Sequence, residues 1–413
     1  MGQSDLAIHG GRPVRNKPLP IMHPGAGYLG KEEIDAVKEV LKAKSMYRFY
    51  GPQFLDVTGG FEADMMRYVG RKHALAVTSG TAALHTALVG LGVKPGDEVI
   101  IPTYGWVACP DAVVATGGTP VLCNVDDSLT LDPADVEAKI TNRTKAIMAV
   151  HIRGTPCDLD GLGRVAKKYG VPLLEDVAQA AGATYHGKKL GSFGRVSSYS
   201  FQLNKMISAG EGGAVLTDDK EVYDRCVMFH DIGTPYRSWE KKGLRLSVEP
   251  FPGLNYRMNE VSAAILREQL KKMDWIIRQI RKNKRRIKRR IGKVPGIEFR
   301  RLNDPQGEAG ISLVFFVDTP EKAVEFKKAL IGENIWTPSG GYPAVVYDPS
   351  SFDGHVFMHW GHIFKGVERV KARYAQSLEL LSRAVHLDIS PLLTDGDADD
   401  VGEAVVKVAE AIL

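Results

Sequence analysis

The clearest pattern along the chain is an alternation of short apolar runs with longer segments of helical periodicity. Five apolar runs predict buried strands, at Ala74–Val77, Val99–Ile101, Val121–Leu122, Ala146–Val150 and Pro172–Glu175. The segments between them predict helices at Ala82–Leu91, Val107–Ala115, Asp132–Ile140 and Leu159–Lys168. Apolar strands that alternate with amphipathic helices are typical of a largely parallel sheet covered on both faces. We therefore predict an α/β fold with such a sheet.

The regions on either side of this alternation predict further units. Residues 1–30 are rich in Gly and Pro and predict an irregular arm, and a helix follows at 31–42 with one apolar face formed by Ile34, Val37, Val40 and Leu41. A long helical tract runs from about 259 to 291, and strand-like 311–317 and helical 320–331 and 398–413 follow it. We therefore expect an N-terminal arm at 1–30, a large domain at 31–258, and a connecting helix with a small α/β domain at 259–413.

Composition narrows the class of protein only modestly. The 413 residues suffice for two domains, and a formal net charge of +5 is small for this length. Four isolated cysteines, Cys109, Cys123, Cys157 and Cys226, form no CxxC pair, so we expect reduced thiols and no metal site. The chain begins without a signal-peptide pattern, and no apolar run approaches the roughly 20 residues that span a bilayer. We expect a cytoplasmic protein with no membrane partner.

Five residues fall at or just beyond the carboxyl ends of the predicted strands, where ligands bind in parallel sheets: Thr78, Pro102, His151, Asp176 and Gln202. Asp176 directly follows the apolar run that ends at Glu175. A helix N-cap or a surface carboxylate is the simpler interpretation of such an Asp. The apolar strand before Asp176 argues against that interpretation, because the end of a buried strand faces the ligand crevice.

Lys205 lies downstream of Asp176, between the strand-like run Ser197–Phe201 and the glycine-rich stretch Gly210–Gly213. Most lysines are simply solvated. A carboxylate at a strand end followed by a lysine bracketed by Ser and glycines is, however, how many proteins hold pyridoxal phosphate. The lysine amine forms a Schiff base with the aldehyde, and the carboxylate keeps the pyridine nitrogen protonated so that the ring can accept electrons.

Two other segments add to this prediction. Thr78-Ser79-Gly80-Thr81 follows a strand and opens a helix, which offers free backbone N–H groups to a phosphate, although a simple N-cap is commoner for such residues. Trp106 follows the next strand and could stack on a flat ring, although a packed aromatic at a domain edge is as common. Each signal is weak alone, and their order and spacing along the chain make the combination specific.

A basic stretch at 278–290 contains nine Lys or Arg residues and invites a nucleic-acid interpretation. Apolar residues recur through it at helical spacing, at Met273, Ile276, Ile277, Ile280, Ile287 and Ile291. This pattern favours an amphipathic helix with a solvated basic face, and no aromatic stacking residues or helix-turn-helix pattern accompany it. We expect no nucleic-acid partner.

These motifs together resemble the sugar aminotransferases of the DegT/StrS type, a branch of the fold-type I pyridoxal-phosphate enzymes. The resemblance covers nearly the whole chain and is carried by four stretches: Thr78–Leu84, Leu174–Ala180, Ser200–Gly213 and Asn255–Glu260. It implies the fold-type I architecture, with a large sheet domain and a smaller C-terminal α/β domain. It also implies a homodimer whose active sites are shared between subunits.

The resemblance implies a role for each matching residue. Gly80 and Thr81 would hold the cofactor phosphate with help from Ser200, and Trp106 would stack on the pyridine ring. Asp176 would pair with the ring nitrogen, and Gln179, three residues further on, would approach the phenolic oxygen. Lys205 would be the Schiff-base lysine, and Asn255 would reach the phosphate in the neighbouring subunit. Lys205 and Asp176 are thus the expected catalytic residues.

The expected reaction moves an amino group from glutamate or glutamine to a keto or aldehyde sugar or a cyclitol, with pyridoxamine phosphate as an intermediate. Two stretches, 281–284 and 304–310, are most similar to the branch that makes 8-amino-3,8-dideoxy-octulosonate, and a nucleotide-linked keto sugar is the other acceptor considered. Candidate acceptor-binding residues are Tyr47–Tyr50, Arg153, Tyr236, Arg237 and Tyr342.

Two alternative functions remain at this stage. Some members of the family are sugar dehydratases in which His replaces the lysine, and this chain keeps Lys205. It also lacks the cysteine cluster of the iron–sulfur centre found in some of those relatives. A nucleic-acid-binding or regulatory protein built on a degenerate enzyme fold is the other alternative, and the basic helix is its sole support.

Overall fold

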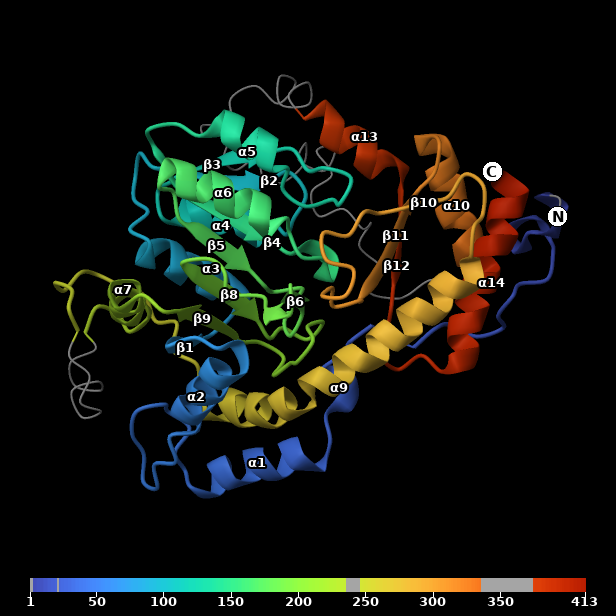
Figure 1. Ribbon diagram of the computed structural model, residues 1–413. Helices are drawn as coiled ribbons and strands as arrows, with labels where there is room; N and C mark the ends of the chain where they lie inside the picture. The colour runs from blue at the N-terminus through green and yellow to red at the C-terminus, as the bar shows by residue number, and fades with distance from the viewer. Residues whose placement is uncertain (1–2, 21, 235–245, 336–373) are drawn as a thin grey trace.

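The computed structural model describes residues 3–20, 22–234, 246–335 and 374–413 (Figure 1). The helices are α1 (Lys31–Lys42), α2 (Val57–Val69), α3 (Gly80–Gly90), α4 (Ala108–Ala115), α5 (Pro133–Lys139), α6 (Leu159–Tyr169), α7 (Lys220–His230), α9 (Glu260–Ile291), α10 (Pro320–Gly332), α13 (Ala375–Arg383) and α14 (Asp395–Ile412). Short 3₁₀ turns are η1 (Gln3–Asp5), η2 (Ala7–His9), η3 (Ala26–Tyr28) and η4 (Ile152–Gly154). None of the described helices is both long and apolar enough to cross a membrane.

The strands form a seven-stranded sheet and two small ones. They are β1 (His73–Val77), β2 (Glu98–Pro102), β3 (Thr119–Cys123), β4 (Thr144–Val150), β5 (Leu173–Asp176), β6 (Thr184–Tyr185), β7 (Lys188–Lys189), β8 (Val196–Ser200), β9 (Gly213–Thr217), β10 (Glu298–Phe299), β11 (Ser312–Phe316) and β12 (Ala384–Asp388). The large sheet has the order β1-β9-β8-β5-β4-β2-β3, and β9 is antiparallel to both of its neighbours. The predicted α/β fold with a mostly parallel sheet is confirmed.

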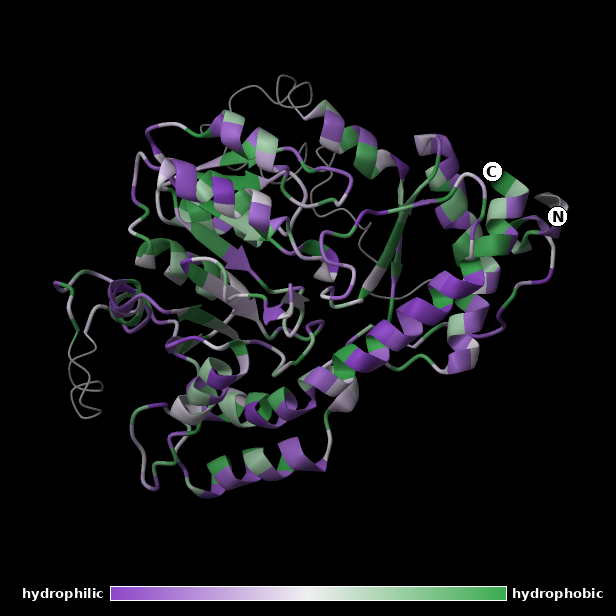
Figure 2. Ribbon diagram, viewed as in Figure 1, coloured by the Kyte–Doolittle hydropathy of each residue, from purple (hydrophilic) through white to green (hydrophobic). Residues whose placement is uncertain are grey.

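Alternation of side chains along the strands explains why helices cover both faces of this sheet. In β1, Ala74 and Ala76 pack into one core cluster, and Leu75 and Val77 pack into the other. The first cluster takes apolar residues from α2, α5, α6 and α9, and the second from α3, α4 and α7. Figure 2 shows hydrophobic residues in the sheet and hydrophilic residues on the outer faces of the helices around it. Strands buried on both faces read as continuous apolar runs, and that is the signal the sequence carries.

The second, smaller sheet has the order β10-β11-β12 and is antiparallel throughout. Helices α10 and α14 pack beside it, and α9 runs from α1 and α2 at one end to α14 at the other (Figure 1). The Asn259 side chain caps α9 by accepting from the Ser262 N–H at 2.8 Å. The long helix predicted from 259 to 291 is therefore confirmed almost to the residue, while the domain boundary at 258 remains a prediction.

Helix α1 has the predicted bounds, but its apolar face packs differently from what the pattern suggests. Val40 is buried, whereas Ile34 is 67% exposed and Leu41 is 52% exposed. The inward position is taken by Glu33, which Lys272 of α9 binds through both carboxylate oxygens, at 2.7 and 2.9 Å. A large part of the apolar stripe of α1 therefore faces away from the core of this chain.

Candidate active site

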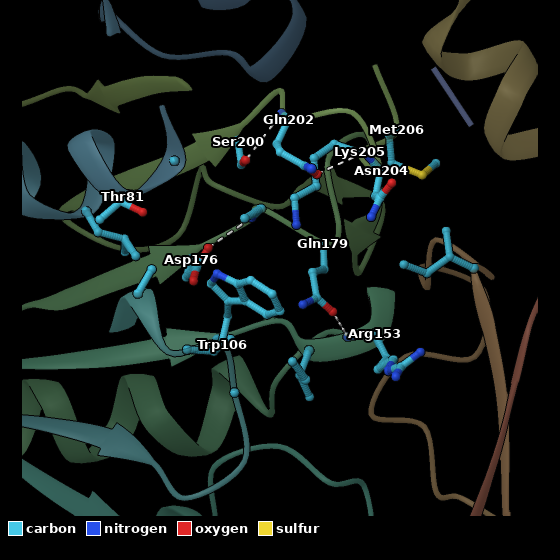
Figure 3. A pocket seen from close by; sticks show the side chains of 18 of the residues that line it. Thr81, Trp106, Arg153, Asp176, Gln179, Ser200, Gln202, Asn204, Lys205 and Met206 are labelled. Carbon is cyan, nitrogen blue, oxygen red and sulfur yellow. Dashed lines mark hydrogen bonds between the residues drawn. The ribbon is translucent and has the colours of Figure 1, made fainter. Parts of the chain in front are cut away.

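A cavity of about 460 Å³ lies at the carboxyl ends of β2, β4, β5 and β8. Its lining includes most of the residues predicted to hold the cofactor: Gly80, Thr81, Trp106, Asp176, Gln179, Ser200 and Lys205 (Figure 3). These residues come from four separate stretches of the chain, and the parallel strands bring them to one edge of the sheet. The sequence therefore located this cavity correctly, and the chemical role of each residue stays a prediction.

The N-terminus of α3 forms one end of the cavity. The Ser79 hydroxyl caps the helix by accepting from the Ala82 N–H at 3.1 Å, so the capping interpretation is correct for Ser79. Gly80 and Thr81 open the first turn and line the cavity. A Cβ atom at Gly80 would lie 2.6 Å from the Ser200 Cβ, so glycine is required for this close approach. First-turn N–H groups and the positive end of the helix dipole favour a phosphate here.

Asp176 ends β5 and is only 4% exposed. Its Oδ1 accepts from the Ala178 N–H at 3.0 Å, and its Oδ2 accepts from the Cys109 thiol at 3.4 Å. Burial raises the pKa of the Asp176 carboxyl, while these two donors and the nearby Lys205 amine oppose the rise. A buried carboxylate of this kind gains stability from a cationic group brought into the cavity, such as a protonated pyridine nitrogen.

Lys205 lies in the loop between β8 and β9. Its backbone is held at both ends, because its N–H donates to the Gln202 carbonyl at 2.9 Å and its carbonyl accepts from the Gly25 N–H at 3.1 Å. Burial lowers the pKa of the Lys205 amine, and the Asp176 charge partly offsets this shift. A lowered pKa increases the fraction of neutral amine, which is the form that attacks an aldehyde.

Two further side chains complete the cavity wall. Trp106 is 42% exposed, so its ring is open to the cavity instead of packed in a core. Gln179 Oε1 accepts from the Arg153 backbone N–H at 2.8 Å, which leaves the amide NH₂ group as the part able to donate to a ligand oxygen. Both arrangements suit a flat ring that carries an oxygen substituent.

Asn255 is the one predicted cofactor-binding residue outside the cavity lining. It is exposed and forms an isolated β-bridge with Asp231. The resemblance gave Asn255 a role in the neighbouring subunit, so its position on the surface of this chain leaves that role as a prediction.

The sequence did not reveal that Cys109 contacts the site, and one residue predicted to bind the acceptor is buried elsewhere. Cys109 was interpreted as an isolated buried thiol, because the bond to Asp176 joins residues 67 positions apart. Arg48 was a candidate acceptor-binding residue, but it is fully buried and pairs with Glu62 at 2.8 Å. Arg153 does line the cavity. Tyr236, Arg237, Tyr342 and the segment 336–362 lie outside the described residues.

The donor set of the cavity fits pyridoxal phosphate. It combines a helix N-terminus suited to a phosphate, a buried carboxyl group, an amine of lowered pKa and an open indole face. Together with the sheet order, this site defines a fold-type I, pyridoxal-phosphate-dependent aminotransferase. Comparison with known proteins narrows the class further. The sequence model of the DegT/DnrJ/EryC1/StrS aminotransferase family matches residues 28–406, and the chain belongs to that family.

Similar proteins include two curated bacterial relatives. The spore coat polysaccharide biosynthesis protein SpsC of Bacillus subtilis (strain 168) is 33% identical over 405 residues, which cover 96% of this chain and 98% of SpsC. GDP-perosamine synthase of Caulobacter vibrioides is 43% identical over 217 residues, which cover 52% of this chain and 56% of that protein. The family and its relatives make this chain a sugar aminotransferase.

Solved structures agree with this fold. The structure of 3-amino-5-hydroxybenzoic acid synthase superposes with a TM-score of 0.79 at 27% identity and covers 95% of this chain and 100% of its own. DesI, solved in the presence of its TDP-sugar product, also has a TM-score of 0.79, at 25% identity, and covers 99% of this chain and 97% of its own.

The basic stretch of α9 is an amphipathic helix, as the pattern favoured. Its isoleucines at 276, 277, 280, 287 and 291 are buried. Several of its cations pair with acidic residues of α14: Lys282 with Asp395, Arg286 with Asp395 and Asp399, and Arg290 with Glu403. Arg281 donates to the carbonyls of Gly307 and Glu308, and Lys284 pairs with Glu308. These contacts give five of the nine basic residues a structural role within the chain.

Proposed function

We propose that this enzyme transfers an amino group from glutamate or glutamine to the carbonyl of a keto or aldehyde sugar in amino-sugar biosynthesis. The observation that carries the proposal is the presence of Lys205 and Asp176 in one cavity beside the N-terminus of α3. The family membership supports the reaction type. Family membership does not identify the acceptor sugar, because the residues that bind the acceptor are not part of the motifs that the family shares.

Each cavity residue has a defined task in this proposal. Bound pyridoxal phosphate would supply an electron sink for charge developing at the substrate carbon. The Asp176 carboxylate would hold a proton at the pyridine nitrogen, and Gly80, Thr81 and Ser200 would hold the phosphate. The Lys205 amine would remove the proton from the amino-acid α-carbon and deliver it again, as a general base and then acid. Amino donor and sugar would use the cavity in turn, which predicts ping-pong kinetics.

The identity of the acceptor is proposed from two directions. The similarity to GDP-perosamine synthase and to DesI, which was solved with its TDP-sugar product, supports a nucleotide-linked keto sugar. The stretches 281–284 and 304–310 support an oxo-octulosonate. In the structure these two stretches contact each other, since Arg281 binds the Gly307 carbonyl and Lys284 binds Glu308. They form a structural unit of the small domain, so their similarity says little directly about the acceptor.

The dehydratase and nucleic-acid alternatives have lost their support. The matching relatives include a perosamine synthase and the family is one of aminotransferases, and this chain carries Lys205 where the dehydratases carry His. The basic helix, which was the sole support for a nucleic-acid role, pairs with α14 and the small domain.

We also propose that the enzyme works as a homodimer. Helix α1 exposes Ile34 and Leu41 one above the other, seven residues apart, and the nearby Met46 is 53% exposed. The Met46 carbonyl accepts from the Glu260 N–H at 2.9 Å, which places this apolar surface close to the Asn255–Glu260 stretch. A partner covering the surface could therefore receive Asn255 into its own site.

Replacement of Lys205 by Ala tests the proposed function. We expect K205A to lose the visible absorbance of the bound cofactor and to lose about 10²- to 10⁴-fold in transamination rate, because the group that moves the proton is gone. Treatment with borohydride in the presence of pyridoxal phosphate should add the cofactor mass to the peptide containing Lys205 in the natural protein and not in K205A. Lys94, an exposed lysine away from the cavity, provides the control variant K94A. Full activity in K205A would refute the proposal.

A further inference from the structure

A second group of charged residues lies on the side of the cavity away from Thr81 (Figure 3). Arg153 and Asp388 line the cavity there, and Tyr104 lies beside them. Arg153 follows β4 of the large sheet, whereas Asp388 ends β12 of the small one. The phosphate-binding end and this charged end face each other across Lys205, so a substrate bound near the amine would extend towards Arg153.

The backbone of Arg153 is held in an unusual conformation. Its φ is +55°, in the left-handed region that a residue with a side chain rarely adopts and that costs roughly 1–2 kcal/mol. The bond from its N–H to Gln179 Oε1 at 2.8 Å holds this turn. Arg153 Nη1 donates to Asp388 Oδ1 at 2.7 Å, and the Tyr104 hydroxyl also bonds the guanidinium. The side chain remains 22% exposed, so part of the guanidinium is open to the cavity.

Behind Arg153 lies Arg300, whose guanidinium has no carboxylate partner among the described residues. Arg300 is 4% exposed, its Nη2 donates to the Thr155 hydroxyl, and its Nη1 is buried with no hydrogen-bond partner in residues 3–20, 22–234, 246–335 and 374–413. Glu308, whose charge acts on Arg300, is already paired with Lys284 at 2.5 Å. Burial and the charge of Arg153 lower the pKa of Arg300 to about 10, with Glu308 opposing them.

Within the described part of the chain, the charges of this cluster do not balance. Among the residues that the structure describes, Arg153, Lys284 and Arg300 are cationic, Arg153 pairs with Asp388, and Lys284 pairs with Glu308. His386 cannot supply a negative charge, and burial together with Arg153, Lys327 and Arg300 keeps its pKa well below the usual value, so it is neutral. A buried excess positive charge is costly unless an anion is brought to it.

We propose that Arg153, with Arg300 behind it, binds a carboxylate group of the substrate. The guanidinium presents a planar fork of N–H donors that matches a carboxylate, and one carboxylate would balance the excess charge of the cluster. This inference rests on the proposed function, since it names the substrate feature that the same cavity recognises. Two substrates could supply the carboxylate: the donor amino acid, or an acceptor that is a sugar acid.

Binding measurements on the cofactor-loaded protein test the proposal and separate the two sources. Glutarate represents the donor without its amine, and 3-deoxy-octulosonate represents a sugar-acid acceptor without its reactive carbonyl. Titration calorimetry gives the Kd of each for the natural protein, R153Q and R153K. We expect R153Q to weaken binding of at least one probe by about 10- to 100-fold, as the loss of a charge-assisted bond implies. R153K keeps the positive charge and loses the planar fork of donors, so its Kd for the probe should lie between those of the natural protein and R153Q.

Controls exclude an effect of folding or of general charge. Arg383 pairs with Glu379 away from the cavity, so R383Q removes the same charge and should bind both probes normally. D388N removes the carboxylate that competes for Arg153 and should bind the probes at least as tightly as the natural protein. Weakened binding in D388N would mean that the cluster has only a structural role and would overturn the proposal.

The outcome for each probe identifies the source. If R153Q binds only glutarate more weakly, Arg153 binds the donor carboxylate. If R153Q binds only 3-deoxy-octulosonate more weakly, Arg153 binds the acceptor carboxylate. Weaker binding of both probes indicates that donor and acceptor use Arg153 in turn. Equal Kd values in R153Q and the natural protein for both probes, or no binding of either to the natural protein, overturn the proposal. Failure of the proposed function itself would appear separately, as a lack of cofactor absorbance and of borohydride labelling in the natural protein.

Discussion

At the scale of single residues, Asp176 shows how the ionisation of a buried carboxyl is adjusted by a neighbour that the sequence does not reveal. The Cys109 thiol is buried and donates to Oδ2, and burial and the Asp176 charge together hold the pKa of the thiol well above its usual value. The thiol therefore stays protonated and remains a donor. It favours the ionised form of Asp176, which is the form that would hold a protonated pyridine.

Replacing Cys109 with Ala should weaken cofactor binding without abolishing it. The lost hydrogen bond is worth about 1 kcal/mol, so we expect the Kd for pyridoxal phosphate to rise about fivefold. C109S keeps a hydroxyl donor and should stay close to the natural protein. Fluorescence or absorbance titration of the apoprotein gives both values. Equal affinity in C109A and the natural protein would show that the thiol does not support Asp176.

Residue identities at the site were predictable where order along the chain carried the information. Lys205 and Asp176 stand out because a strand end and a glycine-rich loop bracket them. Cys109 and Asp388 did not stand out, because their importance comes from contacts with Asp176 and Arg153 that only the folded chain creates. Single polar residues without a local pattern are invisible to sequence periodicity.

At the scale of elements, long helices with a clear apolar stripe were predicted well and short or atypical elements were not. Isoleucines at helical spacing marked α9 almost to its ends. Helix α2 was missed because Gly59 and Gly60 interrupt its pattern, and Gly60 lies where the Arg267 guanidinium of α9 packs against the helix. Strand β9 was missed because its first residue belongs to a glycine-rich stretch that predicts a turn.

Helix α2 begins without a cap of its own and takes one from α9. Its N-cap residue, Asp56, has a φ of +51° and makes no side-chain cap. The buried Glu260 accepts instead from the Val57 N–H at 2.6 Å and from the Thr58 N–H at 2.9 Å. The carboxylate therefore joins the start of one helix to the start of another, about two hundred residues further along the chain.

Changing Glu260 to Gln should destabilise this junction. The new NH₂ group would face backbone N–H donors, and we expect the free energy of unfolding to fall by about 1–3 kcal/mol. E298Q, at an exposed glutamate of β10, is the matched control and should leave the urea midpoint unchanged. The cofactor absorbance of folded E260Q should equal that of the natural protein. An unchanged midpoint in E260Q would contradict the capping role.

At the scale of the whole molecule, the cavity is closed by parts that the sequence places far apart. Arg153 and Asp388 belong to different sheets, and their ion pair ties the small sheet to the edge of the large one. The N-terminal arm also contacts α10, which packs beside the small sheet. The carboxylate of Glu333, the C-cap residue of α10, accepts from the backbone N–H groups of Ala7 and Val14. Pattern analysis predicts elements, and it cannot predict which of them meet.

The exposed stripe of α1 leads to a prediction about assembly. Figure 1 shows α1 on the outside of the molecule, and Ile34 and Leu41 are more than half exposed there. Burying two such side chains against a partner would contribute roughly 3–6 kcal/mol, so the paired substitutions I34K and L41E should raise the dimer Kd at least about 100-fold with no change in net charge. Sedimentation equilibrium measures the dimer Kd directly.

The control pair V324K and I331E changes exposed apolar residues of α10, which are 50% and 53% exposed, and should leave the dimer intact. Because Asn255 is expected to serve the partner's site, the α1 variant should also bind pyridoxal phosphate more weakly, at concentrations where it is monomeric. A variant that keeps the dimer mass would place the interface elsewhere, and dissociation by the α10 pair would place it on the small sheet unit.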